Sequence, residues 1–106
     1  MAQVIWTERA WSEYRTQLIY SKDEFGAKAA KRFYENVSQR TNRLEKYPLT
    51  GFTEPLLQER EESFRSTIVL KNFKLIYHYI REDDIVYIDD LWDMRREPSS
   101  LAKRIK

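Results

Sequence analysis

The hydrophobic period of this chain changes once, and that change most constrains how the chain can fold. Before Pro48, apolar residues recur at the spacing of one face of an amphipathic helix. After Ser63, they alternate with polar residues in short runs rich in β-branched and aromatic side chains. Helices and strands that follow one another in separate blocks are typical of an α+β fold.

The helical part begins with a short predicted strand and a first helix. Residues 3–6 form an apolar run, and Thr7 is a residue type that caps helix N-termini. We therefore expect a strand over 3–6 and a helix over about residues 8–20. The side chains expected on its core-facing side are Ala10, Trp11, Tyr14 and Leu18.

A second helix is expected to begin between residues 23 and 27. Residues 21–24 have the Ser-x-x-Glu form of a capping box, and Gly26 offers another start. The segment "YPLTG" at 47–51 ends this helix, because proline cannot continue one. The short connection between the two helices favours an antiparallel pair. The apolar stripe of the second helix consists of Ala30, Phe33, Val37 and Leu44.

Three strands are predicted after an exposed loop over residues 52–62. They cover 63–70, 73–80 and 85–92, and their short polar connections favour an antiparallel meander. The N-terminal strand is expected to join the same sheet, and Pro98 to begin a helical turn in a short basic tail. The predicted order is β-α-α-β-β-β, an antiparallel sheet with the helical hairpin packed on one face.

The middle strand predicts which sheet face the helices cover. Its alternation places one wholly apolar or aromatic set on the helix-covered face, namely Phe73, Leu75, Tyr77 and Tyr79. Lys74 and His78 then share the other face, about 13 Å apart at the usual strand rise. We expect this second face to be open and rich in apolar side chains, from Ile76, Ile80 and, by register, Val86 or Ile88.

The length and cysteine content limit the class of protein. A chain of 106 residues fits a single domain over residues 1–106, with enough buried surface for one core. It contains no cysteine, so disulfides and thiolate metal sites are excluded. The N-terminus lacks the features of a signal peptide, and no apolar run approaches the roughly 20 residues of a membrane span. We expect a cytoplasmic protein with no membrane partner.

Charge is distributed unevenly along the last part of the chain. The formal net charge of +2 does not by itself imply a nucleic-acid partner. Residues 82–93, however, carry six acidic side chains and no basic one, whereas 95–106 carry five basic side chains and the single acid Glu97. This reversal suggests separate surfaces for separate partners, although a pair of solvated segments is the commoner explanation.

Several kinds of catalytic site are excluded by the residues present. Two glycines are too few for a glycine-rich phosphate loop. A zinc site needs several ligands at close spacing, and the chain has a single histidine. Neither a cysteine nucleophile nor a serine in a nucleophile-elbow pattern occurs. We expect no metal and no cofactor. The remaining candidates are basic or protic: Arg65, Lys71, Lys74, His78, Arg95 and Arg96.

Each strand candidate has a structural explanation beside the functional one. His78 is the only side chain with an ordinary pKa near neutrality, so it could act as a general acid or base. A partly buried histidine satisfied by a neighbour is somewhat commoner. Lys74 is either a phosphate contact or a charge at the sheet edge. Arg65 is expected to pair with one of the acids in 82–93.

The exit from the last strand, "LWDMRREPSSL", holds the most suggestive candidates. Arg95 and Arg96 carry guanidinium groups, which bind phosphate or carboxylate with two hydrogen bonds. Asp93 lies two residues before Arg95 and offers it an internal partner instead.

Five segments in order resemble the RelE/ParE superfamily of bacterial type II toxin–antitoxin toxins, and together they cover nearly the whole chain. They are "VIWTERA", "AAKRFYENV", "LEKYPLTG", "FRSTIVLKNFKLIYHYI" and "IVYIDDLWDMRREPSSL". The last is similar to the family's Asp-x-Arg-x-x-Pro-x-x-Leu exit, which Asp93, Arg95, Pro98 and Leu101 carry here. The resemblance implies the family's fold and a cognate antitoxin as partner.

The resemblance implies one of two targets. RelE-like members cleave messenger RNA on the ribosome, and ParE-like members poison DNA gyrase without known catalysis. Lys74 stands where RelE-like nucleases typically have an arginine, and no tyrosine follows Tyr87 to serve as their C-terminal catalytic residue. We therefore favour gyrase. A ribosome-dependent ribonuclease and a non-toxic, stand-alone binding module are the alternatives.

The two targets imply different site residues. For a ribonuclease, the catalytic residues would be Lys74, His78, Arg95 and Arg96. For binding to the target or antitoxin, the candidates are Arg65, Lys71, Asp93, Arg95 and Arg96. An acidic antitoxin segment is expected to cover the open sheet face and reach Arg95 and Arg96.

Overall fold

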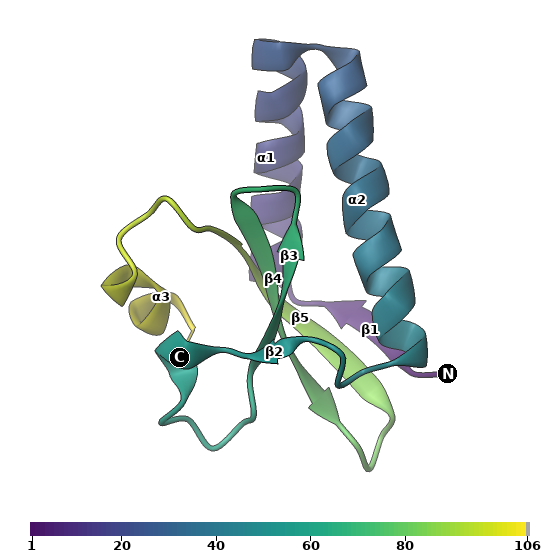
Figure 1. Ribbon diagram of the computed structural model, residues 1–106, viewed down its shortest axis with the longest axis vertical. Coiled ribbons are helices and arrows are strands. Elements are labelled where there is room, and N and C mark those ends of the chain that lie inside the picture. The colour runs from purple at the N-terminus through teal and green to yellow at the C-terminus, as the bar shows by residue number, and fades with distance from the viewer. Residues whose placement is uncertain (106) are drawn as a thin grey trace.

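Two long helices pack against one face of a five-stranded sheet in the computed structural model, which describes residues 1–105 (Figure 1). The helices are α1 (Glu8–Phe25) and α2 (Ala27–Lys46). The strands in sheet order are β1 (Gln3–Trp6), β5 (Ile85–Asp93), β4 (Phe73–Ile80), β3 (Arg65–Val69) and β2 (Phe52–Thr53). A short 3₁₀ helix, η1 (Pro55–Leu57), and the helix α3 (Ser99–Arg104) complete the fold. The predicted α+β class is confirmed.

The sheet is mixed, because its first strand runs parallel to its last. β1 pairs with β5 in parallel, with Gln3 opposite Ile85, whereas the other neighbouring strands are antiparallel. The N-terminal strand joins the sheet as expected, but at the edge beside β5 and with parallel pairing. Within residues 1–105, no helix has the length and apolar character needed to cross a lipid bilayer.

The boundaries of the helical hairpin follow from Thr7 and Gly26. The Thr7 hydroxyl accepts a hydrogen bond from the Ala10 amide at 3.2 Å and caps α1 as predicted. Gly26 has a φ of 93°, which glycine adopts without strain, and it separates the two helices. The helix α1 therefore runs five residues past its expected end at Tyr20, and the proposed capping box at 21–24 is wrong. The second helix does begin inside the predicted interval.

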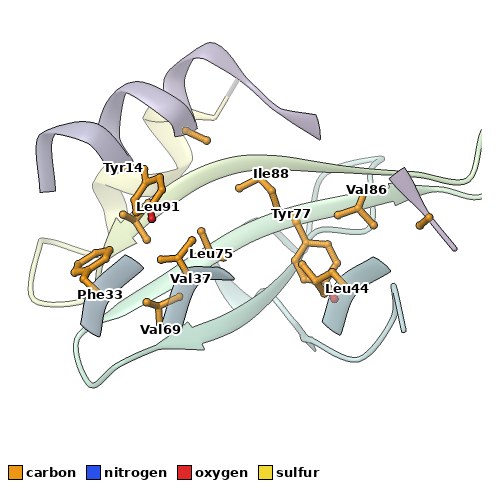
Figure 2. Close-up of a cluster of buried hydrophobic side chains, with 12 residues drawn as sticks. Tyr14, Phe33, Val37, Leu44, Val69, Leu75, Tyr77, Val86, Ile88 and Leu91 are labelled. Carbon is orange, nitrogen blue, oxygen red and sulfur yellow. The ribbon is translucent and has the colours of Figure 1, made fainter. Parts of the chain in front are cut away.

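The main core lies between the helical hairpin and the sheet (Figure 2). Tyr14 from α1 and three residues of the α2 stripe contact side chains of β3, β4 and β5. Trp11 was predicted to belong to this core, but 48% of its surface is exposed. It forms T-shaped contacts with Trp6 and Tyr14, while Ala10 takes the fully buried position on this turn of α1. The buried residues include Phe33, Val37, Leu44, Leu75, Tyr77, Val86, Ile88 and Leu91.

The opposite sheet face is also covered, so the expectation of one core and an open face is wrong. Ile76 is fully buried there in a second hydrophobic cluster, with Leu57, Phe64, Trp92, Leu101 and Ile105. Those residues come from β5, from α3 and the residue after it, and from the 54–64 segment. Residues 52–62 were predicted to be an exposed loop, yet they contain β2 and η1. Each additional buried apolar side chain contributes about 1.5–3 kcal/mol, which favours closing this face.

A β-bulge in β5 decides which residues reach each face. The register pairs Ile76 with Asp90 and Tyr77 with Ile88, so Asp89 is the additional residue. Val86 and Ile88 consequently lie on the helix-covered face in the main core. Their predicted place on the opposite face is wrong.

Candidate functional site

Lys74 lies on the predicted sheet face, away from α1 and α2, but its ammonium group is buried. Its Nζ lies 2.5 Å from Oε1 of Glu54, and both side chains are almost inaccessible to solvent. Glu54 also accepts hydrogen bonds from the Ser66 hydroxyl at 2.7 Å and the Leu56 amide at 2.9 Å. The Lys74–Glu54 ion pair therefore stabilises the connection between β2 and η1 against the sheet. The buried ammonium is not accessible to a phosphate.

His78 lies on the same strand and contacts a second carboxylate. Its Nδ1 is 2.6 Å from Oδ2 of Asp89, the bulged residue of β5. The imidazole stacks on Tyr87 with a centroid distance of 5.3 Å and meets the edge of Phe64 at 5.5 Å. Because 18% of its side chain stays exposed, His78 is a partly buried strand histidine with a bound partner.

The histidine–carboxylate contact changes the pKa of both groups. The hydrogen bond that His78 donates to the Asp89 carboxylate is the main cause that raises the pKa of His78 above its usual 6.5, against the opposing effect of burial. Burial raises the pKa of the Asp89 carboxyl, although the hydrogen bond and charge of His78 act in the other direction. The folded protein thus favours the protonated imidazole.

This pair predicts a pH dependence of folding stability. A histidine whose pKa is raised on folding contributes stability that is complete below 6.5 and is lost as pH rises through the raised value. We expect wild type to lose its stability advantage over His78→Gln across that interval. Urea unfolding of both proteins at several pH values between about 6 and 9 measures the difference. Parallel pH profiles would contradict the prediction.

Arg95 and Arg96 follow β5 and lie against different aromatic rings. Arg95 is paired with Asp93 by two side-chain hydrogen bonds of 2.8 and 2.9 Å, and its guanidinium lies 5.8 Å from the centre of the Phe73 ring. The bond from Arg95 is the main cause that lowers the pKa of Asp93. Arg96 lies 4.8 Å from the centre of the Trp92 ring. Phe73 packs against the main core and Trp92 belongs to the second cluster, so the two arginines are associated with opposite faces of the sheet.

The helix α3 is held to the sheet beside Trp92 by a buried ionic contact. Arg104 donates to Asp90 at 2.8 Å, and its guanidinium lies 5.4 Å from the centre of the Trp92 ring. Glu13 of α1 is a second, longer partner at 3.4 Å. Burial is the main cause that raises the pKa of Asp90, while the charge of Arg104 lowers it.

The remaining two candidates from the sequence, Arg65 and Lys71, do not belong to the exit from β5. Arg65 donates to the Gly51 carbonyl at 2.9 Å, so its partner is a backbone oxygen and none of the acids in 82–93. Lys71 is exposed in the turn between β3 and β4. The structure therefore does not gather Lys74, His78, Arg95 and Arg96 on one accessible surface. Within residues 1–105, no group of three or more metal-ligating side chains is placed to hold an ion.

A groove that the sequence did not reveal lies between the connected ends of α1 and α2 and the β3–β4 turn. We call it the hairpin groove; its volume is about 310 Å³. Its principal lining residues are Tyr20, Phe25, Arg32, Phe33, Phe73 and Arg95. Tyr20 and Phe25 are aromatic residues near the end of α1 that remain exposed. Their presence in the sequence could have indicated the groove.

Comparison with known proteins places this geometry in a family. Residues 4–98 match the family described as ParE toxin of type II toxin-antitoxin system, parDE. The fold is similar to the chromosomal ParDE TA system from P. aeruginosa, with a TM-score of 0.69 and 14% identity over 88% of this chain and 96% of that one. No curated protein sequence matches the chain.

Two further solved structures share the fold. A YoeB/ParE toxin from Agrobacterium tumefaciens has a TM-score of 0.62 and 14% identity, covering 86% of this chain and 96% of that one. The isolated E. coli RelE toxin has a TM-score of 0.60 and 17% identity, covering 100% of each chain.

Proposed function

The chain belongs to the ParE toxin family of type II toxin–antitoxin systems, within the RelE/ParE superfamily, and from this membership we propose that it inhibits growth by binding DNA gyrase. We further propose that a cognate antitoxin neutralises it by covering the surface around Arg95 and Arg96. Residues 1–106 would act as a single toxin domain in the cytoplasm, where gyrase works.

The buried Lys74–Glu54 pair is the observation that carries the choice of gyrase over RNA. Cleavage of RNA by attack of the 2′-hydroxyl needs cations beside the proton-transfer group, to stabilise the additional charge on the phosphate. Among the candidates predicted from the sequence, Lys74 is the one cation on the same strand as His78. Its ammonium is already paired with Glu54. Arg95 and Arg96 stay exposed, as a protein-binding surface requires.

The antitoxin part of the proposal is supported by the relatives. The family description names a toxin–antitoxin system, and one solved structure with this fold is the intact E. coli RelBE toxin-antitoxin complex. Arg96 and most of the Arg95 side chain are accessible, and basic side chains of this kind favour an acidic partner segment.

One observation favours the ribonuclease alternative. His78 and Asp89 form the imidazole–carboxylate pair that general acid–base catalysis uses, and part of the ring is exposed. This alternative would need its phosphate-binding cations from a surface other than that of Lys74.

Purified toxin, tested in parallel on both targets, distinguishes these functions. We expect it to inhibit DNA supercoiling by gyrase and to cause accumulation of cleaved DNA, while messenger RNA on ribosomes stays intact. Addition of the antitoxin should reverse the effect. Codon-periodic cuts in messenger RNA with intact DNA would establish the ribonuclease, and activity on neither target would indicate a stand-alone binding module.

A further inference from the structure

We propose that Arg96 is the main anchor of the toxin on gyrase, and that the buried Trp92 is the positioning residue that holds its guanidinium ready for an acidic side chain of gyrase. This inference rests on the proposed inhibition of gyrase, and it gives the two arginines at the exit from β5 different roles. Arg95 lies against Phe73, which packs on the main core, whereas Arg96 lies against Trp92 of the second cluster.

The two guanidiniums differ in how much of their hydrogen-bonding capacity is already used within the toxin. Arg95 donates from Nε and one terminal nitrogen to Asp93, at 2.9 and 2.8 Å. Within residues 1–105, the side chain of Arg96 has no ion pair or hydrogen bond, although Glu97 follows it directly in the chain. Arg96 therefore offers all of its side-chain N–H donors to a partner, including the fork that a carboxylate accepts with two hydrogen bonds.

Three hydrogen bonds fix the backbone of this exit. The Met94 amide donates to the Asn72 carbonyl at 2.7 Å, which ties the exit to the β3–β4 turn. The Asp93 carboxylate accepts from the Arg95 amide, and the Asp93 carbonyl accepts from the Arg96 amide, both at 3.0 Å. The Cα atom of Arg96 is therefore held in a closed turn next to the end of the sheet.

Trp92 supports the side chain of Arg96. The guanidinium carbon of Arg96 lies 4.8 Å from the centre of the indole ring, within the range of a cation–π contact. Trp92 is itself only 1% exposed, and the guanidinium carbon of Arg104 lies 5.4 Å from the centre of its ring. Arg104 donates to the buried carboxylate of Asp90 at 2.8 Å, which keeps α3 in place beside the indole. The indole is therefore a rigid support for an otherwise flexible side chain.

A supported arginine binds a partner more tightly than a mobile one, because it loses less conformational freedom on binding. Ordering one side chain with many rotamers weakens affinity by about 3- to 10-fold, and the contact with Trp92 removes much of this cost for Arg96. Tryptophan and arginine are also enriched among the residues that dominate the affinity of protein interfaces. Arg96 thus has the features expected of the main anchor.

The surroundings of Arg96 favour a protein over a nucleic acid as its partner. Asp93 and Glu97 lie within three residues of it, and their carboxylates repel a phosphodiester backbone. A single acidic side chain of gyrase needs only the one guanidinium, which presents a planar pair of donors to it. We therefore expect the toxin to bind gyrase in the absence of DNA.

The test is inhibition of gyrase supercoiling by toxin variants, measured as concentration–response curves. We expect Arg96→Ala to weaken inhibition about 30- to 100-fold, and Arg95→Ala only about three- to fivefold. Arg81→Ala removes an exposed arginine from the β4–β5 turn, and it should leave inhibition within about twofold of wild type. Isothermal titration calorimetry of toxin into gyrase without DNA should give the same order of affinities.

Trp92 is tested through its coupling to Arg96. Trp92→Leu removes the ring and should weaken inhibition about 3- to 10-fold, whereas Trp92→Phe keeps an aromatic face and should recover most of the loss. In the Arg96→Ala background, Trp92→Leu should have no further effect on inhibition. Phe64→Leu removes another buried ring from the same cluster, and it should leave inhibition unchanged despite its cost in packing.

A measurement on wild type tests the support without any substitution. Nuclear magnetic resonance should show the side-chain δ protons of Arg96 shifted upfield by the ring current of the indole. The relaxation of Nε should show that this group is more rigid in Arg96 than in Arg81. Arg96 signals that match those of Arg81 would overturn the role of Trp92.

Three further results would overturn the inference while leaving the proposed function intact, because in each of them the wild type inhibits gyrase. The first is a loss in Arg95→Ala as large as that in Arg96→Ala. The second is a Trp92→Leu loss that persists in the Arg96→Ala background. The third is an Arg96→Ala toxin that inhibits gyrase normally but escapes the antitoxin. Wild-type toxin that leaves gyrase active would refute the proposed function itself, and the anchor with it.

Discussion

Replacement of Lys74 by methionine is expected to lower the free energy of unfolding by about 3–5 kcal/mol, the usual cost of removing one partner from a buried ion pair. The reason is that the carboxyl group of Glu54, which is fully buried, would lose the ammonium that lies 2.5 Å away. Ser66 and the Leu56 amide would still donate to the carboxylate, but two neutral donors do not replace a cation. Urea unfolding followed by tryptophan fluorescence measures the loss.

Two further variants make this prediction specific. The double variant Lys74→Met/Glu54→Gln removes both charges, and we expect it to recover more than half of the lost stability. Lys71→Met changes a lysine three residues away that is exposed in the β3–β4 turn, and it should change stability by less than about 0.5 kcal/mol. If Lys74→Met instead folded as stably as wild type but lost toxicity, Lys74 would be a functional cation, and the argument against RNA cleavage would fail.

The second large effect concerns toxicity itself. We expect the double variant Arg95→Ala/Arg96→Ala to weaken gyrase inhibition by about 100-fold or more, because both exposed arginines of the exit from β5 are removed together. His78→Gln should weaken gyrase inhibition by less than about fivefold, since the imidazole is hydrogen-bonded to Asp89 of the toxin itself. Concentration–response curves in a supercoiling assay measure both.

If the toxin is a ribonuclease, His78→Gln should instead cause a large loss of toxicity. Loss of a general acid or base costs about 10²–10⁴-fold in rate, so His78→Gln would then nearly abolish toxicity. Lys103→Ala, an exposed basic residue in α3, serves as the control for a mere change in net charge. Retained toxicity in the double arginine variant would exclude the exit from β5 as the target surface.

Local periodicity was sufficient to predict most of the secondary structure. The 3.6-residue period located both helices, and the alternation in 73–80 assigned Leu75 and Tyr77 to the helix-covered face. The same pattern could not show that the opposite face is closed. That closure depends on Leu57 and Leu101, which lie in short segments without a period of their own.

The candidate site was harder to predict, because its contacts join residues far apart in the chain. Glu54 lies among four acids of an apparently solvated stretch, and nothing local distinguishes it as the partner of Lys74. The bulge at Asp89 is likewise set by pairing with β4. By contrast, the pairing of Asp93 with Arg95 spans two residues, and the sequence did suggest it.

The parallel pairing of β1 with β5 has a consequence for how the toxin is made. Residues 3–6 are translated long before residues 85–88, which are their strand partners in the described residues 1–105. β1 therefore has no neighbouring strand until nearly the whole sheet has emerged from the ribosome. Contacts over so long a separation form late, because the intervening loop must close first. A nascent chain interrupted before β5 lacks both the strand that completes the sheet and the arginines that follow it. We therefore expect translation products truncated before β5 to be inactive, because they lack that strand and the two arginines that follow it.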